Sequence, residues 1–377
     1  MFTEVLKIAM LSMALNIIFV PVNQTVAVLA GYTTIIATLC LPFIELKKPV
    51  CLRVKPSGVC LMGIGLIMLC SALMHTGYHN INLDLIKTIL SFFCCYMAIM
   101  IDKHVIQKRD LRQIFFINKC LSCILVAYTY LPFSFRYTTI NEWNGQQFTM
   151  GMGNPNATSI NVVFCVVLLV LEIIWQSNRI QKVFCIGLLG ALAGTLIQLQ
   201  SRTVIVCCGL ILLAGFFKPI RLRKGIIAVV ILFPLAMVFV QIWLGTINTN
   251  IQFIGKAIAT GREKMFTELF HTIENAPSDF ILGQILTYRL ENSHNAPLAL
   301  VLSVGILGYI LFVLMWNYEF QDILSTKHMT KLQYIACLAL LAYMIHSSSE
   351  ASPMLGGIPY ATQMVLLSRL AKDAVSV

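Results

Sequence analysis

Long apolar runs alternate with short polar segments along the whole chain. A helix that crosses a bilayer needs roughly 20 predominantly apolar residues, and many of these runs approach that length. No low-complexity or linker segment divides the chain, so we treat residues 1–377 as a single membrane domain. The pattern predicts an all-α, polytopic integral membrane protein with about 12 transmembrane helices. We place these helices near residues 8–20, 26–45, 58–73, 86–101, 114–132, 157–175, 183–199, 203–217, 225–244, 296–316, 333–347 and 353–370.

Two longer polar segments interrupt this alternation, at residues 133–156 and 245–295. Within the second segment, Thr260 and Glu263 have the spacing of a capping box, which predicts the start of a helix. We therefore expect 245–295 to be a partly helical loop that lies on the membrane surface or against the bundle. Apolar residues recur at helical spacing after the predicted cap, at Met265, Phe266, Leu269, Phe270 and Ile273.

The composition supports a membrane protein and excludes other classes. Hydrophobic residues make up 58% of the chain and charged residues only 11%, against roughly 25% charged residues in soluble domains. A net charge of +11 would suggest a nucleic-acid partner in a soluble protein. Here the basic residues gather in loops between apolar runs, so we expect no nucleic-acid partner. The 13 cysteines lie in apolar runs or in a short basic loop, which predicts free thiols that pack as small hydrophobic groups.

Most of the 27 lysines and arginines fall in alternate loops, and this pattern predicts an orientation. Cytoplasmic loops carry an excess of Lys and Arg, so the basic loops and both termini are predicted to be cytoplasmic. The segments 133–156 and 245–295 then face the opposite side of the membrane. Lys87 and Lys119 fall within predicted spans near their ends, where a long side chain can extend to the interface.

The few cations predicted on that opposite side are candidates for binding an anion. Arg202 lies in LQSRTVIV between two apolar runs, and a charge at a helix centre in the membrane costs roughly 2.5–3.5 kcal/mol. Arg262 falls in the first turn of the helix predicted after Thr260, where the helix dipole disfavours a cation unless an anion such as phosphate is bound. The alternatives are an arginine that extends to the interface for Arg202 and a solvated surface arginine for Arg262.

His294 stands at the mouth of the apolar run 296–316, directly before Asn295, a plausible helix N-cap. An imidazole with a pKa near 6.5 is a suitable general base at neutral pH, although a single interfacial histidine is often without a catalytic role. His75 and His79 share a short loop, but the sequence offers no third metal ligand beside them. The chain also contains no D-x-D pair, which argues weakly against a nucleotide-sugar transferase that uses a divalent metal.

Four segments together resemble bacterial O-antigen ligases and the related Wzy-type polymerases. HNAPLALVLSVGILG matches their motif of a histidine, a small polar residue and two spaced glycines, at His294, Asn295, Gly305 and Gly308. ATGREKMF resembles the Gly-Arg segment of their large periplasmic loop, with Phe266 where an aromatic residue, often Trp, is usual. LQSRTVIV is similar to their Ser-Arg turn, and MGNPNATS, which contains Asn154, Pro155 and Asn156, is similar to a segment before a mid-chain span.

The resemblance covers roughly residues 150–315 and implies a lipid-linked glycan transferase of the bacterial inner membrane that needs no metal or cofactor. Its donor would be a glycan on undecaprenyl pyrophosphate at the periplasmic face, and the reaction would invert the anomeric configuration. The resemblance implies that His294 acts as the catalytic base and that Arg202 and Arg262 bind the leaving pyrophosphate. Further candidates for donor or acceptor contacts are Arg289, Lys264, Asn156, Tyr288 and Asn295.

Several functions remain open at this stage. A polymerase would transfer the glycan to a second lipid-linked repeat unit, with a chain-length regulator and a flippase as further partners, whereas a ligase would transfer it to lipid A–core. The GNPN segment at 153–156 favours a polymerase. A secondary transporter would suit the number of spans, but the sequence has neither the midplane charges nor the internal repeat typical of transporters. A non-catalytic scaffold in a polysaccharide assembly complex is the remaining alternative.

Overall fold

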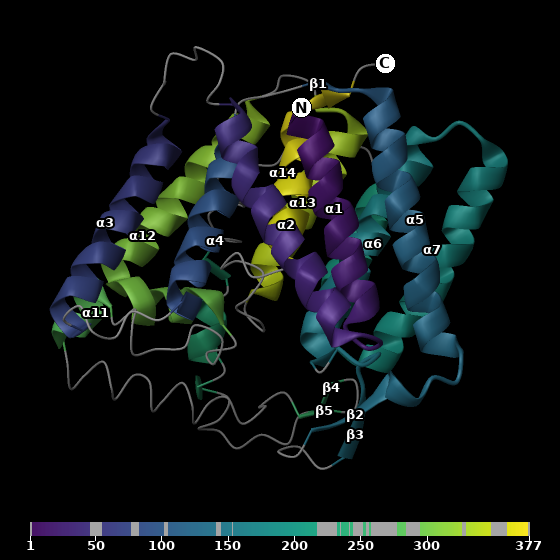
Figure 1. Ribbon diagram of the computed structural model, residues 1–377, viewed down its shortest axis with the longest axis horizontal. Helices are drawn as coiled ribbons and strands as arrows, with labels where there is room; N and C mark the ends of the chain where they lie inside the picture. The colour runs from purple at the N-terminus through teal and green to yellow at the C-terminus, as the bar shows by residue number, and fades with distance from the viewer. Residues whose placement is uncertain are drawn as a thin grey trace.

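A computed structural model shows a bundle of helices with short strands at both of its ends (Figure 1). Helices dominate the described part of the chain, which confirms the prediction of an all-α protein. The structure describes residues 2–45, 55–76, 83–101, 105–140, 145–152, 154–216, 232–233, 235–240, 242–243, 252–253, 256–257, 277–283, 295–325, 329–347 and 360–375.

Six helices within these ranges are long and apolar enough to cross a membrane, and four shorter helices are also apolar. The predicted spans correspond to helices wherever the structure describes them, although half of the predicted span 225–244 lies outside the described residues. The helices are α1 (Phe2–Phe19), α2 (Gln24–Glu45), α3 (Pro56–Thr76), α4 (Leu83–Met100), α5 (Lys108–Tyr130), α6 (Pro155–Trp175), α7 (Arg179–Leu199), α8 (Arg202–Phe216), α11 (Pro277–Leu282), α12 (Ala296–Leu324), α13 (Lys331–His346) and α14 (Tyr360–Lys372).

The bundle has two distinct ends. Both chain termini lie at one end, which we call the termini end, beside the short strands β1 (Val105–Ile106) and β6 (Ala374–Val375) (Figure 1). Strands β2 to β5 lie at the opposite end, which we call the loop end. Helices α6, α8, α12 and α14 all begin at the loop end.

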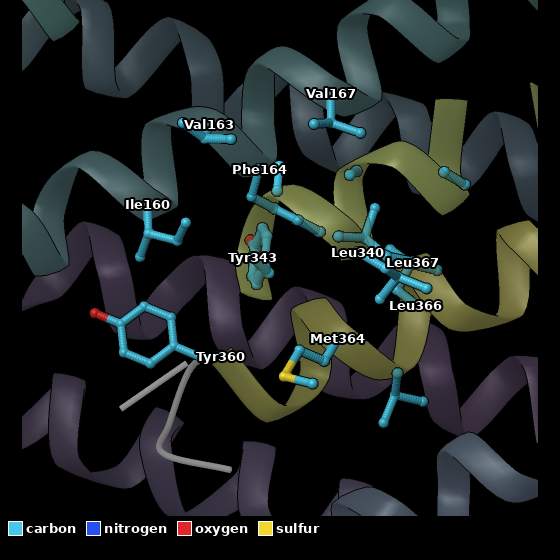
Figure 2. Close-up of a cluster of buried hydrophobic side chains, with 14 of the residues drawn as sticks. Ile160, Val163, Phe164, Val167, Leu340, Tyr343, Tyr360, Met364, Leu366 and Leu367 are labelled. Atoms are coloured by element: carbon cyan, nitrogen blue, oxygen red, sulfur yellow. The ribbon is translucent and has the colours of Figure 1, made fainter. Parts of the chain in front are cut away.

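The centre of the core lies between α6, α13 and α14. Figure 2 shows apolar side chains of the three helices packed together, and these residues are almost completely buried. Every residue of α6 from Thr158 to Glu172 is buried, because neighbouring helices cover all of its faces. The labelled members of this cluster are Ile160, Val163, Phe164, Val167, Leu340, Tyr343, Tyr360, Met364, Leu366 and Leu367.

The polar composition of residues 133–156 suggested a loop, but part of this segment has regular secondary structure. A short 3₁₀ turn, Ser134–Arg136, leads into an antiparallel pair of strands, β2 (Tyr137–Ile140) and β3 (Gly145–Phe148). Aromatic and β-branched residues such as Tyr137, Thr138 and Ile140 favour extended backbone, which explains the hairpin. A second pair, β4 (Gln252–Phe253) and β5 (Lys256–Ala257), belongs to the long loop 245–295.

Ion pairs fasten the termini end. Lys7 on α1 bonds to Asp110 on α5 at 2.8 Å, and Lys119 on α5 bonds to Glu172 on α6 at 2.8 Å. Lys119, which lies within a predicted span, therefore has a buried carboxylate as its partner. Within α14 and its surroundings, Arg369 pairs with Asp373, Lys372 pairs with Glu319, and all four side chains are almost completely buried.

Candidate functional site

The structure describes some of the predicted site residues and not others. It describes Asn156 and Asn295 with their side chains, and it describes the backbone of Arg202 as the first residue of α8. The remaining candidates, and the helix predicted after Thr260, lie outside the described residues. These candidates are His294, Arg262, Lys264, Tyr288 and Arg289.

The start of α6 is built by the GNPN segment. The Asn154 side-chain oxygen accepts hydrogen bonds from the backbone N–H groups of Asn156 at 2.8 Å and Ala157 at 3.4 Å, and Pro155 occupies the first helical position. Asparagine is a favoured N-cap and proline is well tolerated directly after it, so this segment encodes a sharp helix start. The cap leaves the side chain of Asn156 available for other contacts.

Asn156 contacts a second motif segment. The Ser201 hydroxyl donates a hydrogen bond to the Asn156 side-chain oxygen at 3.1 Å. Ser201 is 3% exposed and directly precedes Arg202, the first residue of α8. Two segments that are far apart in the sequence, GNPN and QSR, therefore meet at the loop end. This contact brings Asn156 next to the turn that carries Arg202.

A strained residue makes this close connection between α7 and α8. Gln200 caps the end of α7 with φ 50° and ψ 30°, a left-handed conformation that residues other than glycine seldom adopt. The chain reverses there within two residues, so α8 begins immediately after α7 ends. Left-handed residues also occur in the turn before α6, at Met150 with φ 51° and at Gly151 with φ 75°. Strained backbone of this kind tends to gather at functional sites.

The β2–β3 hairpin is tied to the start of α6 and carries a cation that sequence analysis did not select. Thr149 donates its backbone N–H to the carbonyl of Arg136 at 3.0 Å, and Thr158 of α6 donates its hydroxyl to the carbonyl of Thr149 at 3.3 Å. The Arg136 guanidinium lies 5.8 Å from the centre of the Tyr137 ring and 5.7 Å from that of Phe148. These distances fit cation–π contacts, which keep Arg136 at the loop end.

Asn295 caps α12 as predicted. Its side-chain oxygen accepts the backbone N–H of Leu298 at 3.0 Å, and the residue is 1% exposed. This cap fixes the point where α12 begins. The structure gives no contact between Asn295 and the Asn156–Ser201 pair, so it brings together only some of the predicted segments among the residues that it describes.

Gly305, a glycine of the same motif, interrupts α12 where another segment packs against it. Its φ of 67° and ψ of −179° are not helical, and a β-carbon there would lie 1.9 Å from the carbonyl oxygen of Ile281 on α11. A β-carbon at Gly283, which has φ 76°, would lie 2.3 Å from the backbone of Ser303, and the Gly283 carbonyl accepts a hydrogen bond from Ser71 of α3 at 2.7 Å. The glycine therefore allows part of the long loop to dock on α12.

A buried polar chain below the start of α6 was also missed from the sequence. Gln363 of α14 donates to the Asn161 side-chain oxygen at 2.7 Å and accepts a hydrogen bond from the Tyr343 hydroxyl of α13 at 2.5 Å. Tyr360 donates its hydroxyl to the carbonyl of Ala157 at 3.1 Å. These bonds hold α6 against α13 and α14. In the sequence, the only indication of these bonds is that polar residues occur inside apolar runs. Such residues need hydrogen-bonding partners in the membrane.

The other candidate chemistry concerns histidine and cysteine. His346, at the loop end of α13, is fully buried. The cysteines that the structure describes are all free, which confirms the prediction for them. No group of three or more His, Cys, Asp or Glu residues within the described ranges has metal-binding geometry, and the side chains of His75 and His79 lie outside these ranges.

The N-terminal ends of α6 and α8 meet at the Asn156–Ser201 contact, and α14 begins nearby, where Tyr360 bonds to the carbonyl of Ala157. A helix N-terminus carries a partial positive charge, so several of them together favour a bound anion. Comparisons with known proteins add no family: no family model matches the chain, and no curated protein matches it. The function is therefore argued from the segments and their geometry.

Proposed function

We propose that this protein is a lipid-linked glycan transferase of the bacterial inner membrane, most specifically an O-antigen polymerase. The hydrogen bond between Ser201 and Asn156, 3.1 Å long, supports this proposal most strongly. It joins two of the four segments on which the family resemblance depends. The contact places both segments together at the loop end, where the proposed donor would bind.

The proposed reaction moves a glycan from undecaprenyl pyrophosphate to a sugar hydroxyl. The hydroxyl oxygen attacks the anomeric carbon, the bond to the pyrophosphate oxygen breaks, and His294 takes up the hydroxyl proton. Arg202, Arg262 and the helix N-termini at the loop end stabilise the negative charge that develops on the leaving pyrophosphate. Arg289, Lys264 and Tyr288 are the further candidates for contacts with donor or acceptor.

In this proposal the loop end faces the periplasm and both termini are cytoplasmic. The acceptor is a second lipid-linked repeat unit for a polymerase and lipid A–core for a ligase. The GNPN segment favours the polymerase, and its role as the cap and contact site of α6 gives it a structural purpose. A chain-length regulator and a flippase would be the natural protein partners of such an enzyme.

The first experiment compares lipopolysaccharide on gels from a source strain that lacks this gene. The strain receives the wild-type gene, His294→Ala, or His271→Ala as a matched control from the same loop, with protein levels checked by immunoblot. We expect the strain without the gene, and the one with His294→Ala, to show a core with a single repeat unit, and His271→Ala to restore the ladder. A bare core with long chains still on the lipid carrier would indicate a ligase, and an unchanged ladder would contradict both.

The proposed anion site has its own tests. Arg262→Lys keeps the positive charge but loses the planar guanidinium that binds phosphate through two hydrogen bonds, so we expect strongly reduced glycan transfer. Arg202→Ala should have a similar effect, and a normal glycan profile from it would remove Arg202 from the proposed mechanism. Treatment of the purified protein with a chelator should leave transfer intact, whereas a loss of transfer would point to a metal site.

A further inference from the structure

A second site, independent of the proposed function, lies at the termini end. A pocket of about 490 Å³ opens there between α5, the last turn of α6 and the first turn of α7. This volume is within the range of small-ligand sites. Arg112, Phe116 and Lys119 line it from α5, and Glu172 and Trp175 line it from α6, with amide side chains completing the wall.

Side-chain hydrogen bonds join α5 and α7 towards the loop end, away from the pocket. There Tyr130 of α5 donates its hydroxyl to the carbonyl of Ala191 on α7 at 3.0 Å, and the hydroxyls of Thr129 and Thr195 are bonded at 3.0 Å. Gly194 leaves room for the Tyr130 hydroxyl, which approaches its backbone closely. At the termini end no described contact of this kind closes the space between the two helices, and the pocket lies there.

The charges of the side chains that line the pocket do not cancel. Lys119 and the buried carboxylate of Glu172 neutralise each other at 2.8 Å. Arg112 is exposed and makes no ion pair with a described residue, so its positive charge is available to a ligand. A further cation lies in the first turn of α7, at Arg179. A helix N-terminus disfavours cations, and a bound anion would remove that repulsion.

Apolar surface continues directly from this charge into the depth of the membrane. Phe116 lies one helical turn after Arg112 on the same face of α5 and is 64% exposed. Cys120 and Cys123 extend this exposed face. Trp175 marks the level at which α6 ends, and tryptophan is enriched at the boundary between membrane and water. A ligand that fits must therefore carry an anionic group at the interface and an apolar chain below it.

We propose that this pocket holds the head group of an anionic bilayer phospholipid. Its phosphate contacts Arg112, and an acyl chain runs along Phe116 between α5 and α7. Basic pockets between helices near the membrane surface commonly bind anionic lipid head groups, because each cation adds electrostatic attraction. The neutral Lys119–Glu172 pair closes the inner wall and leaves Arg112 as the principal cation.

Quenching of Trp175 by brominated lipid tests this site. The protein is placed in phosphatidylcholine vesicles in which a fixed minority of lipids carries brominated chains, as phosphatidylglycerol or as phosphatidylcholine. Trp175→Phe identifies the part of the fluorescence that Trp175 contributes. We expect brominated phosphatidylglycerol to quench Trp175 preferentially, and Arg112→Ala to weaken this preference about fivefold, as for the loss of one surface cation. Arg109→Ala, an exposed arginine of the same helix that does not line the pocket, should keep the preference.

Equal quenching by the two lipids in the wild type would overturn the proposal, and so would an unchanged preference in Arg112→Ala. Inorganic phosphate, added at constant ionic strength, should not displace the lipid. If it abolished the preference, the site would be one for soluble phosphate. If polyprenyl phosphate displaced brominated phosphatidylglycerol better than unlabelled phosphatidylglycerol does, the occupant would be a lipid carrier, and the phospholipid assignment would fail.

Discussion

Charged side chains hold the termini end of the bundle, whereas amide and hydroxyl groups hold the loop end. All ion pairs among the described residues lie at the termini end, including the buried pair of Lys372 with Glu319. At the loop end, Asn154 and Asn295 cap helices, and Ser201 bonds to Asn156. Several of these ion pairs join two helices, and the two side chains of each pair neutralise each other's charge. The asparagine caps at the loop end instead satisfy free backbone N–H groups of the first helical turns and add no charge.

Breaking an ion pair at the termini end should have the largest effect on stability. Lys372→Ala leaves Glu319, 2% exposed, as an uncompensated buried charge, so we expect a loss of about 3–5 kcal/mol. The measurement is the thermal unfolding of the purified protein in detergent. Lys108→Ala, an exposed lysine, is the control and should change little.

The double variant Lys372→Met with Glu319→Leu sharpens this result. Removing both charges together replaces an ion pair with apolar groups, which is often neutral, so much of the lost stability should return. If the double variant were as unstable as Lys372→Ala alone, the cost would come from lost packing and not from the unpaired carboxylate.

The docking of α11 on α12 should give the next largest effect. Gly305→Ala forces a side chain into a left-handed position and against the carbonyl of Ile281, so we expect a loss of about 1–3 kcal/mol from the backbone strain alone. Gly209→Ala is the matched control, because a β-carbon there meets no atom within 4 Å and alanine favours a helix. Thermal unfolding of the two variants side by side measures the difference, and equal stability would contradict the close approach at Gly305.

The Asn156–Ser201 contact should contribute less stability than either feature. Ser201→Ala removes one buried hydrogen bond, worth about 1 kcal/mol. A double-mutant cycle of Asn156→Ala and Ser201→Ala should give a coupling energy of that order in thermal unfolding, since the residues are direct partners. Additive effects of the two substitutions would show that the contact does not form in solution.

The smallest effect should be a gain at the turn between α7 and α8. Gln200→Gly removes the strain of a left-handed residue that has a side chain, and we expect a rise of up to about 1 kcal/mol in the free energy of unfolding. Gln200→Val should lower it, because a β-branched residue fits that conformation poorly. Comparison of the three proteins by thermal unfolding tests the assignment, which a loss of stability in Gln200→Gly would contradict.

The sequence predicted the helices well because apolar runs of membrane length leave the chain few other structures. It also predicted the cap at Asn295, since that signal is local: an asparagine followed closely by Pro297 and an apolar run. The capping role of Asn154 has the same local signature but was not recognised. Local sequence patterns therefore indicate where these two helices begin.

Contacts between distant segments could not be predicted in this way. Nothing in the sequence near Lys119 indicates Glu172 as its partner, and the bonds of Gln363 to Asn161 and Tyr343 join three helices. Their geometry depends on how the helices pack. The catalytic role of His294 and the anion-binding roles of Arg262 and Arg202 stay predictions, because they depend on side chains outside the described residues.

The parallel pairing of β1 with β6 has a consequence for how the protein is made. Val105 pairs with Ala374 and Ile106 with Val375, so the chain after α14 joins the segment between α4 and α5. During synthesis, α1 to α13 emerge before α14. The core therefore lacks the side chains of α14 until the C-terminal part of the chain is made. The buried charges of Arg369, Lys372 and Asp373 lose their water only at that step. Completion of the bundle is therefore a late event in biogenesis, after most helices have entered the membrane.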